Sequence, residues 1–90
     1  MSDETAIPAF GRGVKFRFDT VRKGWVLLAP ERVYVPNDIA VEILKLVDGE
    51  RSIGAIADTL SVRFDAARDL IAADVIAVLD DLSARGGIQL

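Results

Sequence analysis

The apolar residues of this chain change their spacing near residue 36, and that change restricts the possible folds more than any other feature. Before it, Val14, Phe16 and Phe18 alternate with polar residues, which is the period of a half-buried strand. After it, apolar residues recur at intervals of three and four, which is typical of helices. Pro36 stands at the boundary and ends a strand, because proline has no backbone N–H. The chain therefore predicts strands first and helices second.

Three strands are expected in the first part. The first covers 14–19, and the polar segment 20–24 that follows it is a turn ending in glycine. The second strand, 25–29, is apolar on both faces and should therefore be central in its sheet, with cover on each side. A Pro-Glu dipeptide breaks it, and 32–35 alternates again as a short third strand. The simplest arrangement is an antiparallel meander in which the first and third strands are edges.

Three helices are expected in the rest of the chain. Asn37 caps the first, Ser52 the second and Asp65 the third, because these side chains accept hydrogen bonds from the first helical turn. Gly49 closes the first helix, and the third stops before Gly86. The positions expected to face inward are Ile39, Ala40, Ile43, Leu44 and Val47, then Ile53, Ile56, Ala57 and Leu60, then Ala67, Leu70, Ile71, Val75, Val78, Leu79 and Leu82.

These elements predict an α+β domain that is winged-helix-like: a three-stranded antiparallel sheet followed by a three-helix bundle. Residues 14–90 form this one domain, and 1–13 are expected to be a flexible N-terminal lead-in from which Ile7, Ala9 and Phe10 could still dock. The chain lacks both a signal-like start and the roughly 20 apolar residues that span a bilayer, so a cytoplasmic location is expected.

The residue types that are missing exclude several kinds of active site. The chain contains no cysteine and no histidine, which removes thiolate nucleophiles, Ser-His pairs and zinc sites built on these residues. It also has no Gly-rich phosphate loop. The adjacent acids Asp80 and Asp81 point about 100° apart on a helix and do not face one another. We therefore expect no enzyme activity, no metal site and no cofactor.

The charge narrows the class of partner. The net charge is −3, whereas a nucleic-acid-binding surface is normally basic. A winged-helix nucleic-acid binder stays an alternative, but its third helix would carry only Arg68 and Arg85 against several aspartates, a balance that repels phosphate. Residues 12–32 are basic. This hairpin is a candidate contact for an acidic peptide or protein surface, or it is simply solvated.

Several segments, taken in order, carry a family resemblance. They are GVKFRFD at 13–19, VR at 21–22 and WVLLAPE at 25–31, then Ala40, Ile43-Leu44, Asp48-Gly49, Ile53, Ile56, Asp74-Val75, Leu79 and Leu82. The run LLAPE after the pattern D-x-V-R is the most telling part. The set covers residues 8–90 and resembles the PqqD family of pyrroloquinoline quinone (PQQ) biosynthesis. The fold of that family is shared by recognition elements for ribosomally synthesised and post-translationally modified peptides (RiPPs).

The resemblance implies a binding function without catalysis. PqqD-like proteins bind the precursor peptide PqqA and present it to the radical S-adenosylmethionine (SAM) enzyme PqqE. PqqE holds the iron–sulfur clusters and joins a glutamate and a tyrosine side chain of the peptide. The chain would then be a peptide chaperone with no cofactor of its own. Some family members are fused to the oxidase PqqC, so a larger parent chain stays open.

The resemblance also implies where the peptide binds. In related recognition domains the leader peptide adds to the third strand and lies against the third helix. An exposed strand edge offers unpaired N–H and C=O groups to such a peptide. This placement assigns peptide binding to Arg32, Val33, Tyr34, Val35, Leu70, Ile71, Asp74, Val75 and Val78.

The same residues allow plainer interpretations. We favour the core over the groove for Val33 and Val35, and we expect Tyr34 to point oppositely, as a recognition contact or an ordinary surface residue. Asp74 accepts a hydrogen bond from the peptide or pairs with a nearby arginine. Trp25 is expected in the core. A dimerisation domain that uses the exposed strand edges, without a peptide ligand, is the remaining alternative.

Overall fold

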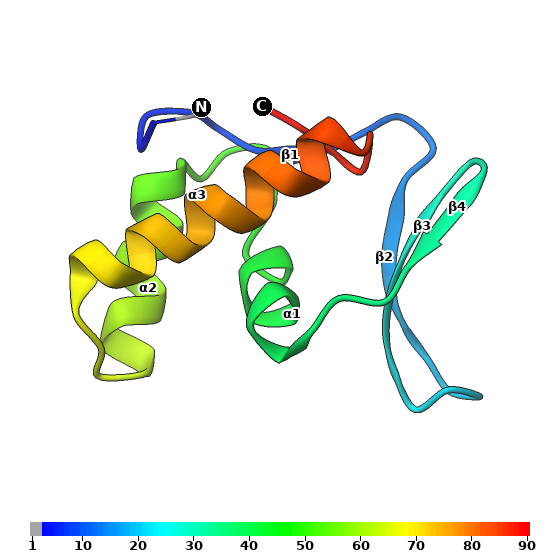
Figure 1. The fold of residues 1–90 in the computed structure, drawn as a ribbon, viewed down its shortest axis with the longest axis horizontal. Helices are drawn as coiled ribbons and strands as arrows, with labels where there is room; N and C mark the ends of the chain where they lie inside the picture. Colours follow the sequence, from blue (N-terminus) through cyan, green and yellow to red (C-terminus); the bar gives the residue numbers. More distant parts are fainter. Residues whose placement is uncertain (1–2) are drawn as a thin grey trace.

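The computed structural model describes residues 3–90 and confirms the predicted order of three strands followed by three helices, with a further short strand before and after them. The strands are β1 (Ala9–Phe10), β2 (Lys15–Asp19), β3 (Gly24–Ala29), β4 (Arg32–Tyr34) and β5 (Ile88–Gln89), and the helices are α1 (Asp38–Leu44), α2 (Ile53–Arg63) and α3 (Arg68–Ala84). Figure 1 shows the sheet of β2, β3 and β4 at one end of the view, and all three helices lie on the same face of this sheet. This is the predicted α+β architecture.

The three-stranded sheet is an antiparallel meander with β3 in its centre and β2 and β4 at its edges, as predicted. The register places Phe16 and Tyr34 on either side of Leu27, so these three side chains share the face toward the helices. The centre of β3 is buried on both faces, because Val26 and Leu27 point in opposite directions and are only 2% and 0% exposed.

A second, two-stranded sheet joins the beginning and the end of the described chain, where β1 pairs antiparallel with β5. Of the three apolar residues considered for docking, Ala9 and Phe10 form β1, whereas Ile7 is half exposed. Pro8 is buried beside them. The segment from residue 3 onward therefore lies against the body of the domain, and residues 1 and 2 of the predicted lead-in lie outside the described residues.

Helix α1 begins as predicted and ends earlier. The side chain of Asn37 caps it by accepting a hydrogen bond from the backbone N–H of Ala40 at 2.9 Å. The helix ends at Leu44, before the predicted stop at Gly49, which takes a left-handed conformation (φ +78°) in the following bend. The prediction that Ile39 faces the core is wrong. Its side chain is 59% exposed, because it lies beside an open hollow between α1 and α3.

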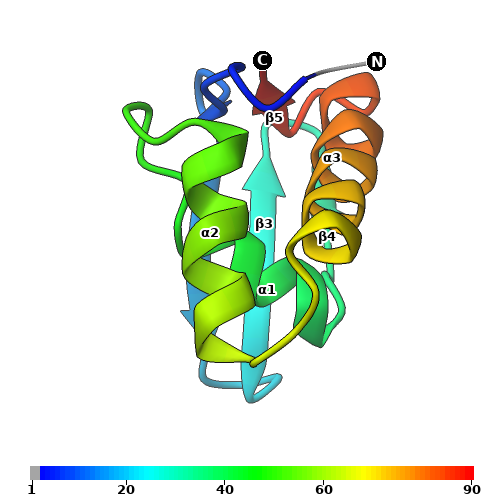
Figure 2. The same cartoon turned by 90° about the vertical axis from the view of Figure 1, so that its left-hand side faces the viewer.

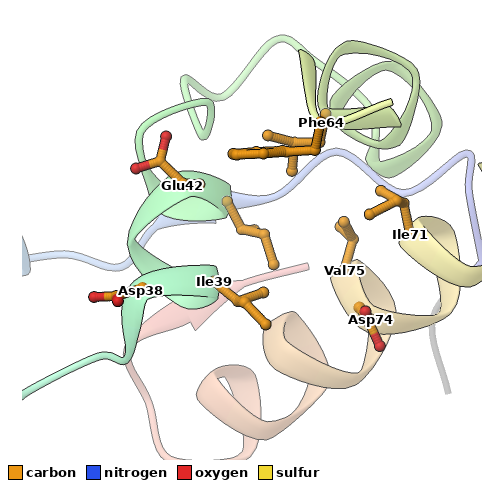
Figure 3. A pocket seen from close by; sticks show the side chains of 9 residues that line it. Asp38, Ile39, Glu42, Phe64, Ile71, Asp74 and Val75 are labelled. Carbon is orange, nitrogen blue, oxygen red and sulfur yellow. The ribbon is translucent and has the colours of Figure 1, made fainter. Parts of the chain in front are cut away.

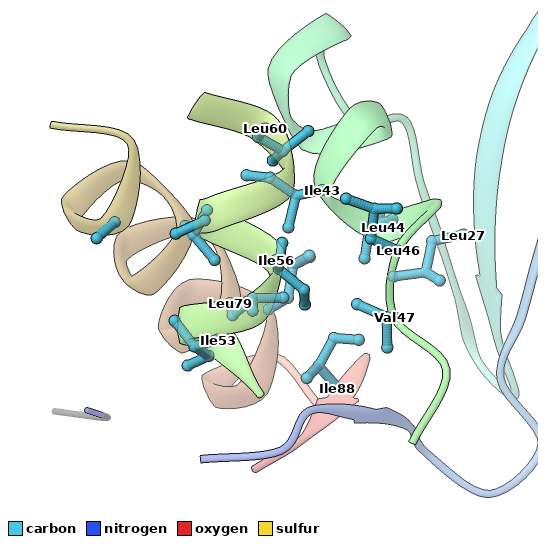
Figure 4. Close-up of a cluster of buried hydrophobic side chains, with 14 residues drawn as sticks. Leu27, Ile43, Leu44, Leu46, Val47, Ile53, Ile56, Leu60, Leu79 and Ile88 are labelled. Atoms are coloured by element: carbon cyan, nitrogen blue, oxygen red, sulfur yellow. The ribbon is translucent and has the colours of Figure 1, made fainter. Parts of the chain in front are cut away.

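Helix α2 and the core agree with the prediction. The Ser52 hydroxyl accepts a hydrogen bond from the N–H of Ala55 at 3.1 Å, and the expected inward face of α2 is buried. Figure 4 shows how this face meets side chains from the other elements. The labelled members of the cluster are Leu27, Ile43, Leu44, Leu46, Val47, Ile53, Ile56, Leu60, Leu79 and Ile88.

Helix α3 begins later than predicted. Asp65 has φ +49°, and an N-cap needs extended backbone, so Asp65 cannot cap the helix. The N-cap is Ala67, which makes no side-chain bond and is exposed. Val75, Leu79 and Leu82 are buried as expected, together with Ala72, which the periodicity did not select. The prediction that Leu70 faces inward is wrong: it is 66% exposed, because the buried stripe of α3 is narrower than its apolar stripe.

Candidate functional site

A groove lies between the edge strand β4 and helix α3, with a volume of about 350 Å³. We call it the β4–α3 groove. Its walls are Val33, Tyr34 and Val35 on one side and Val78, Asp81, Leu82 and Arg85 on the other, completed by Leu27, Pro36, Asn37 and Ala40. In Figure 2 the helices α2 and α3 lie in front of the sheet, so the groove follows the side of the sheet that the helices cover.

Tyr34 and Gly87 set the distance between the walls of this groove. The Tyr34 hydroxyl donates a hydrogen bond to the backbone carbonyl oxygen of Arg85 at 2.6 Å. A Cβ at Gly87 would lie 3.0 Å from Cδ2 of Leu27, closer than an ordinary van der Waals contact, so a larger residue here would require the Leu27 side chain to shift. The interpretation of Tyr34 as an outward-pointing surface residue is therefore wrong. Its ring faces the helices and its hydroxyl holds the end of α3.

Val33 and Val35 are exposed rather than buried, at 54% and 67%, which corrects the core interpretation that the sequence favoured. The reason is the alternation of side chains along a strand: Tyr34 takes the inward position, so its neighbours cannot. Val33 lies opposite Leu28 of β3, on the face of the sheet away from the helices. Both valines remain at the rim of the groove.

A second hollow of about 220 Å³ lies against the earlier turns of α3, and we call it the apolar pocket. It is lined by Asp38, Ile39, Glu42 and Ile43 of α1, Leu60 of α2, Phe64 just after α2, and Ile71, Asp74 and Val75 of α3. Figure 3 shows Ile39, Phe64, Ile71 and Val75 pointing toward one another across the cavity. Ile39 and Phe64 are 59% and 53% exposed, so apolar surface is open to solvent here.

Carboxylates surround the apolar pocket, and they differ in their partners. Glu42 is held by Lys45 at 3.1 Å and by Arg63 at 3.4 Å. Asp38 and Asp74 make no salt bridge with any described residue. The interpretation that Asp74 pairs with a nearby arginine is therefore wrong for residues 3–90, and its carboxylate is available to a ligand.

The structure divides the nine predicted peptide-binding residues among three places. Val33, Tyr34, Val35 and Val78 line the β4–α3 groove, and Ile71, Asp74 and Val75 line the apolar pocket. Arg32 and Leu70 line neither hollow: Arg32 is exposed at the start of β4, and Leu70 is exposed on α3. The two hollows use consecutive turns of α3, because Val75 borders one and Val78 the other.

Sequence reasoning missed several lining residues. Phe64 is a large apolar residue in an otherwise polar segment after α2, and this was a signal that a helical pattern alone does not use. Ile39 was assigned to the core because its spacing fitted the inward stripe, whereas Leu82 is buried as predicted and also lines the groove. Asp81 and Arg85 form a salt bridge at 3.3 Å beside the groove, and nothing in the sequence separates them from other surface charges.

Trp25 belongs to an aromatic cluster at the side of the sheet, where it is half-buried rather than fully in the core. Its ring stacks on Phe16 with a centroid distance of 4.7 Å and meets the edge of Phe18 at 5.8 Å. The ammonium of Lys45 lies 5.3 Å from the indole centroid, a cation–π distance. These contacts attach α1 to the hairpin of β2 and β3.

Two other features are absent within the described residues. No three acidic, histidine or cysteine side chains gather there in a way that would hold a metal ion. Among the helices of residues 3–90, none combines the length and the apolar character needed to cross a bilayer.

Comparison with known proteins identifies the family. The family model for coenzyme PQQ synthesis protein D (PqqD) matches residues 24–88. The chain belongs to the PqqD family. The PqqA binding protein of Rhodopseudomonas palustris strain HaA2 is 55% identical over 92% of this chain and 81% of that protein. The bifunctional coenzyme PQQ synthesis protein C/D of Methylorubrum extorquens is 44% identical over 88% of this chain, which corresponds to 21% of that longer PqqD relative.

Solved structures support the PqqD fold. The solution structure of the PqqD part of Methylobacterium extorquens PqqCD, a stand-alone RiPP recognition element, has a TM-score of 0.84 and 40% identity over 98% of this chain and 94% of that one. The crystal structure of PqqD from Xanthomonas campestris has a TM-score of 0.59 and 39% identity, with 94% of each chain covered. Lasso peptide synthetase B1, complexed with its leader peptide, shares the fold at a TM-score of 0.79 and 20% identity.

Proposed function

We propose that this chain binds the precursor peptide PqqA and serves PQQ biosynthesis as a peptide chaperone, without a catalytic centre of its own. Membership of the PqqD family supports the proposal, as do relatives that are PqqA binding proteins. The observation that carries it is the β4–α3 groove, a partly apolar channel directly beside an edge strand. Such a site suits an extended peptide better than a compact small molecule.

The peptide adds to the sheet as a fourth strand beside β4. Within residues 3–90, β4 pairs only with β3, so its other edge is free. Two residues connect these strands, and Ala29 and Arg32 are the pair that flanks this turn. Antiparallel pairs alternate between bonded and non-bonded, and the pair that closes a tight turn is bonded. Leu28 and Val33 form the next pair in the register, which is therefore non-bonded. We infer that the N–H and C=O of Val33 point away from β3, toward the incoming peptide.

The side chains of the peptide supply the selectivity. In an added strand, alternate side chains point toward the helices, where Tyr34 and Val78 line the groove. A peptide that continues along α3 reaches the apolar pocket, where Ile39, Phe64 and Ile71 offer open apolar surface. We therefore expect PqqA to bind through main-chain pairing at β4 and through at least one apolar side chain in the pocket.

Two variants of Val33 separate main-chain pairing from side-chain contact. Val33→Pro removes the N–H at an edge position where proline is tolerated, so PqqA affinity measured by calorimetry should fall about tenfold. Val33→Ala keeps the N–H and should bind within about threefold of the unsubstituted chain. Circular dichroism checks that both variants are folded. Equal affinity of the folded Val33→Pro variant and the unsubstituted chain would rule out strand addition at β4.

We further propose that the bound peptide is presented to the radical SAM enzyme PqqE. Strand addition supports this, because it holds one segment of the peptide and leaves the rest free to enter an active site. Calorimetry with PqqA, in the absence and presence of PqqE, should show that the peptide and the enzyme bind at the same time. The glutamate–tyrosine crosslink should form much more slowly without this chain. An equal rate of crosslinking without it would contradict presentation.

A further inference from the structure

The charges of the chain are divided between its two parts. Residues 12–32, which include β2, β3 and the turns beside them, contain six lysines and arginines against two acids. Residues 33–90 contain five lysines and arginines against ten acids. The sheet half is therefore basic and the helical half acidic, although the net charge of the chain is only −3.

The two parts also differ in how their cations are paired. In the helical half, all five cations make salt bridges: Lys45, Arg51, Arg63, Arg68 and Arg85. In the sheet half, by contrast, Arg22 makes a salt bridge with Asp19 at 3.7 Å. The cations of residues 12–32 that have no salt bridge to any described residue are Arg12, Lys15, Arg17, Lys23 and Arg32.

Two of these cations lie on the face of the sheet that the helices leave open. The register places Lys15, Leu28 and Val33 in one row across the three strands. Arg17 and Val26 form the next row on the same face. Figures 1 and 2 agree that all three helices lie on the opposite side of this sheet. We call Lys15, Arg17, Leu28 and Val33 the outer sheet face. Val26 shares the row of Arg17 but is only 2% exposed, so it offers no surface to a partner.

The outer sheet face combines an apolar centre with a basic edge. Val33 is 54% exposed and Leu28 is half-buried, and they lie beside the exposed side chains of Lys15 and Arg17. An acidic surface placed here would provide the counter-charges that the chain itself does not, while the apolar row excludes water. Duplex nucleic acid fits less well, because its affinity comes from many phosphate contacts and this face offers two cations.

We propose that the outer sheet face docks an acidic protein surface while the peptide occupies the β4–α3 groove. The inference rests on the proposed function, since the partner is the enzyme that receives the peptide. A peptide added beside β4 lies in the same sheet, and its alternate side chains point to the outer side. A protein on this face therefore touches the bound peptide as well as the chain, and both together form its docking surface.

The test compares charge reversals that change the net charge equally. Arg17→Glu reverses an unpaired cation of the outer sheet face, and Arg51→Glu reverses a cation of the helical half that is paired with Asp48 at 3.5 Å. Calorimetry measures the affinity of each PqqA-loaded variant for PqqE at low and high salt. We expect Arg17→Glu to bind about tenfold more weakly, and Arg51→Glu to bind within about twofold of the unsubstituted chain. Lys15→Glu should repeat the result on the same strand.

The remaining outcomes reject the inference in distinguishable ways. If the unsubstituted chain binds PqqE and both Arg17→Glu and Lys15→Glu bind it equally well, the docking surface lies elsewhere and the proposed function stands. If the unsubstituted chain does not bind PqqE, presentation and docking both fail. Light scattering that shows self-association lost in Arg17→Glu would assign the face to a second copy of the chain. Loss of duplex DNA binding in that variant would assign it to nucleic acid. PqqA affinity should be the same in all variants.

Discussion

Two leucines of α3 provide a matched test of where the core ends. Leu79 is fully buried in the central cluster, whereas Leu70, which the helical periodicity also predicted to be buried, is 66% exposed. Leu79→Ala and Leu70→Ala remove the same atoms from the same helix. The difference between their free energies of unfolding therefore reports the burial of the two side chains.

The burial of each side chain sets the expected size of its effect. Removing a buried methylene costs about 0.8 kcal/mol, and Leu→Ala removes about three such groups, so the transfer cost at Leu79 is about 2.4 kcal/mol. The cavity left behind adds to this, and we expect a loss of about 3 kcal/mol. At Leu70 about a third of the side chain is covered, and alanine favours the helix slightly, so we expect about 0.5 kcal/mol.

Urea unfolding measures both values, followed by far-ultraviolet circular dichroism and by the fluorescence of Trp25, the one tryptophan of the chain. With a slope of about 1 kcal/mol per molar urea, the midpoint should fall by about 3 M for Leu79→Ala and about 0.5 M for Leu70→Ala. If the free energy of unfolding falls by less than about 1 kcal/mol in Leu79→Ala, or by equal amounts in the two variants, α3 does not turn Leu79 toward the core and Leu70 toward solvent. The assignment of Ile71 to the apolar pocket and Val78 to the β4–α3 groove would then also be wrong, because it depends on the same orientation of α3.

Two further changes test the pocket and the acid response. Phe64→Ala should weaken PqqA binding about tenfold in calorimetry, because Phe64 is a half-exposed wall of the apolar pocket, whereas Val62→Ala, which is 83% exposed and lines no part of it, should leave the affinity unchanged. Equal affinities in these two variants would remove the pocket from the site. Hydrogen bonds from the backbone N–H groups of Arg51 and Glu50 hold the pKa of Asp48 below its ordinary 3.8. A lowered pKa in the folded state contributes stability above pH 3.8 that is lost as the pH falls toward the lowered value. The urea midpoint of Asp48→Ala should therefore fall less steeply below pH 3.8 than that of the unsubstituted chain, and identical slopes would contradict this.

The fold was predictable where local pattern and tertiary environment agree. The central position of β3 followed from its two apolar faces, and α2 followed from the Ser52 cap and an apolar stripe that is buried along its length. In these elements each local preference matches the final burial. The start of α3 was not predictable in this way, because Asp65 is a good cap by residue type but has a left-handed backbone.

The candidate site was only partly predictable because apolar spacing does not distinguish a core from an uncovered binding surface. Ile39, Leu70 and Val33 all fitted inward-facing patterns, and all are more than half exposed. A strand shows only two faces in its sequence, and which one the helices cover is decided by residues far away in the chain. Periodicity therefore located the elements of the site, while the family resemblance supplied the expectation that a peptide binds between them.

The hydrogen bond from Tyr34 to Arg85 joins residues that are 51 positions apart in the sequence. It ties the wall of the β4–α3 groove that β4 contributes to the C-terminal end of α3. For the proposed peptide, a groove whose width is set largely on folding would reduce the ordering entropy lost on binding. A side chain too broad for this groove has to break the bond, at a cost of about 1 kcal/mol. In the proposed binding mode, folding thereby limits the size of the peptide side chains that the groove accepts.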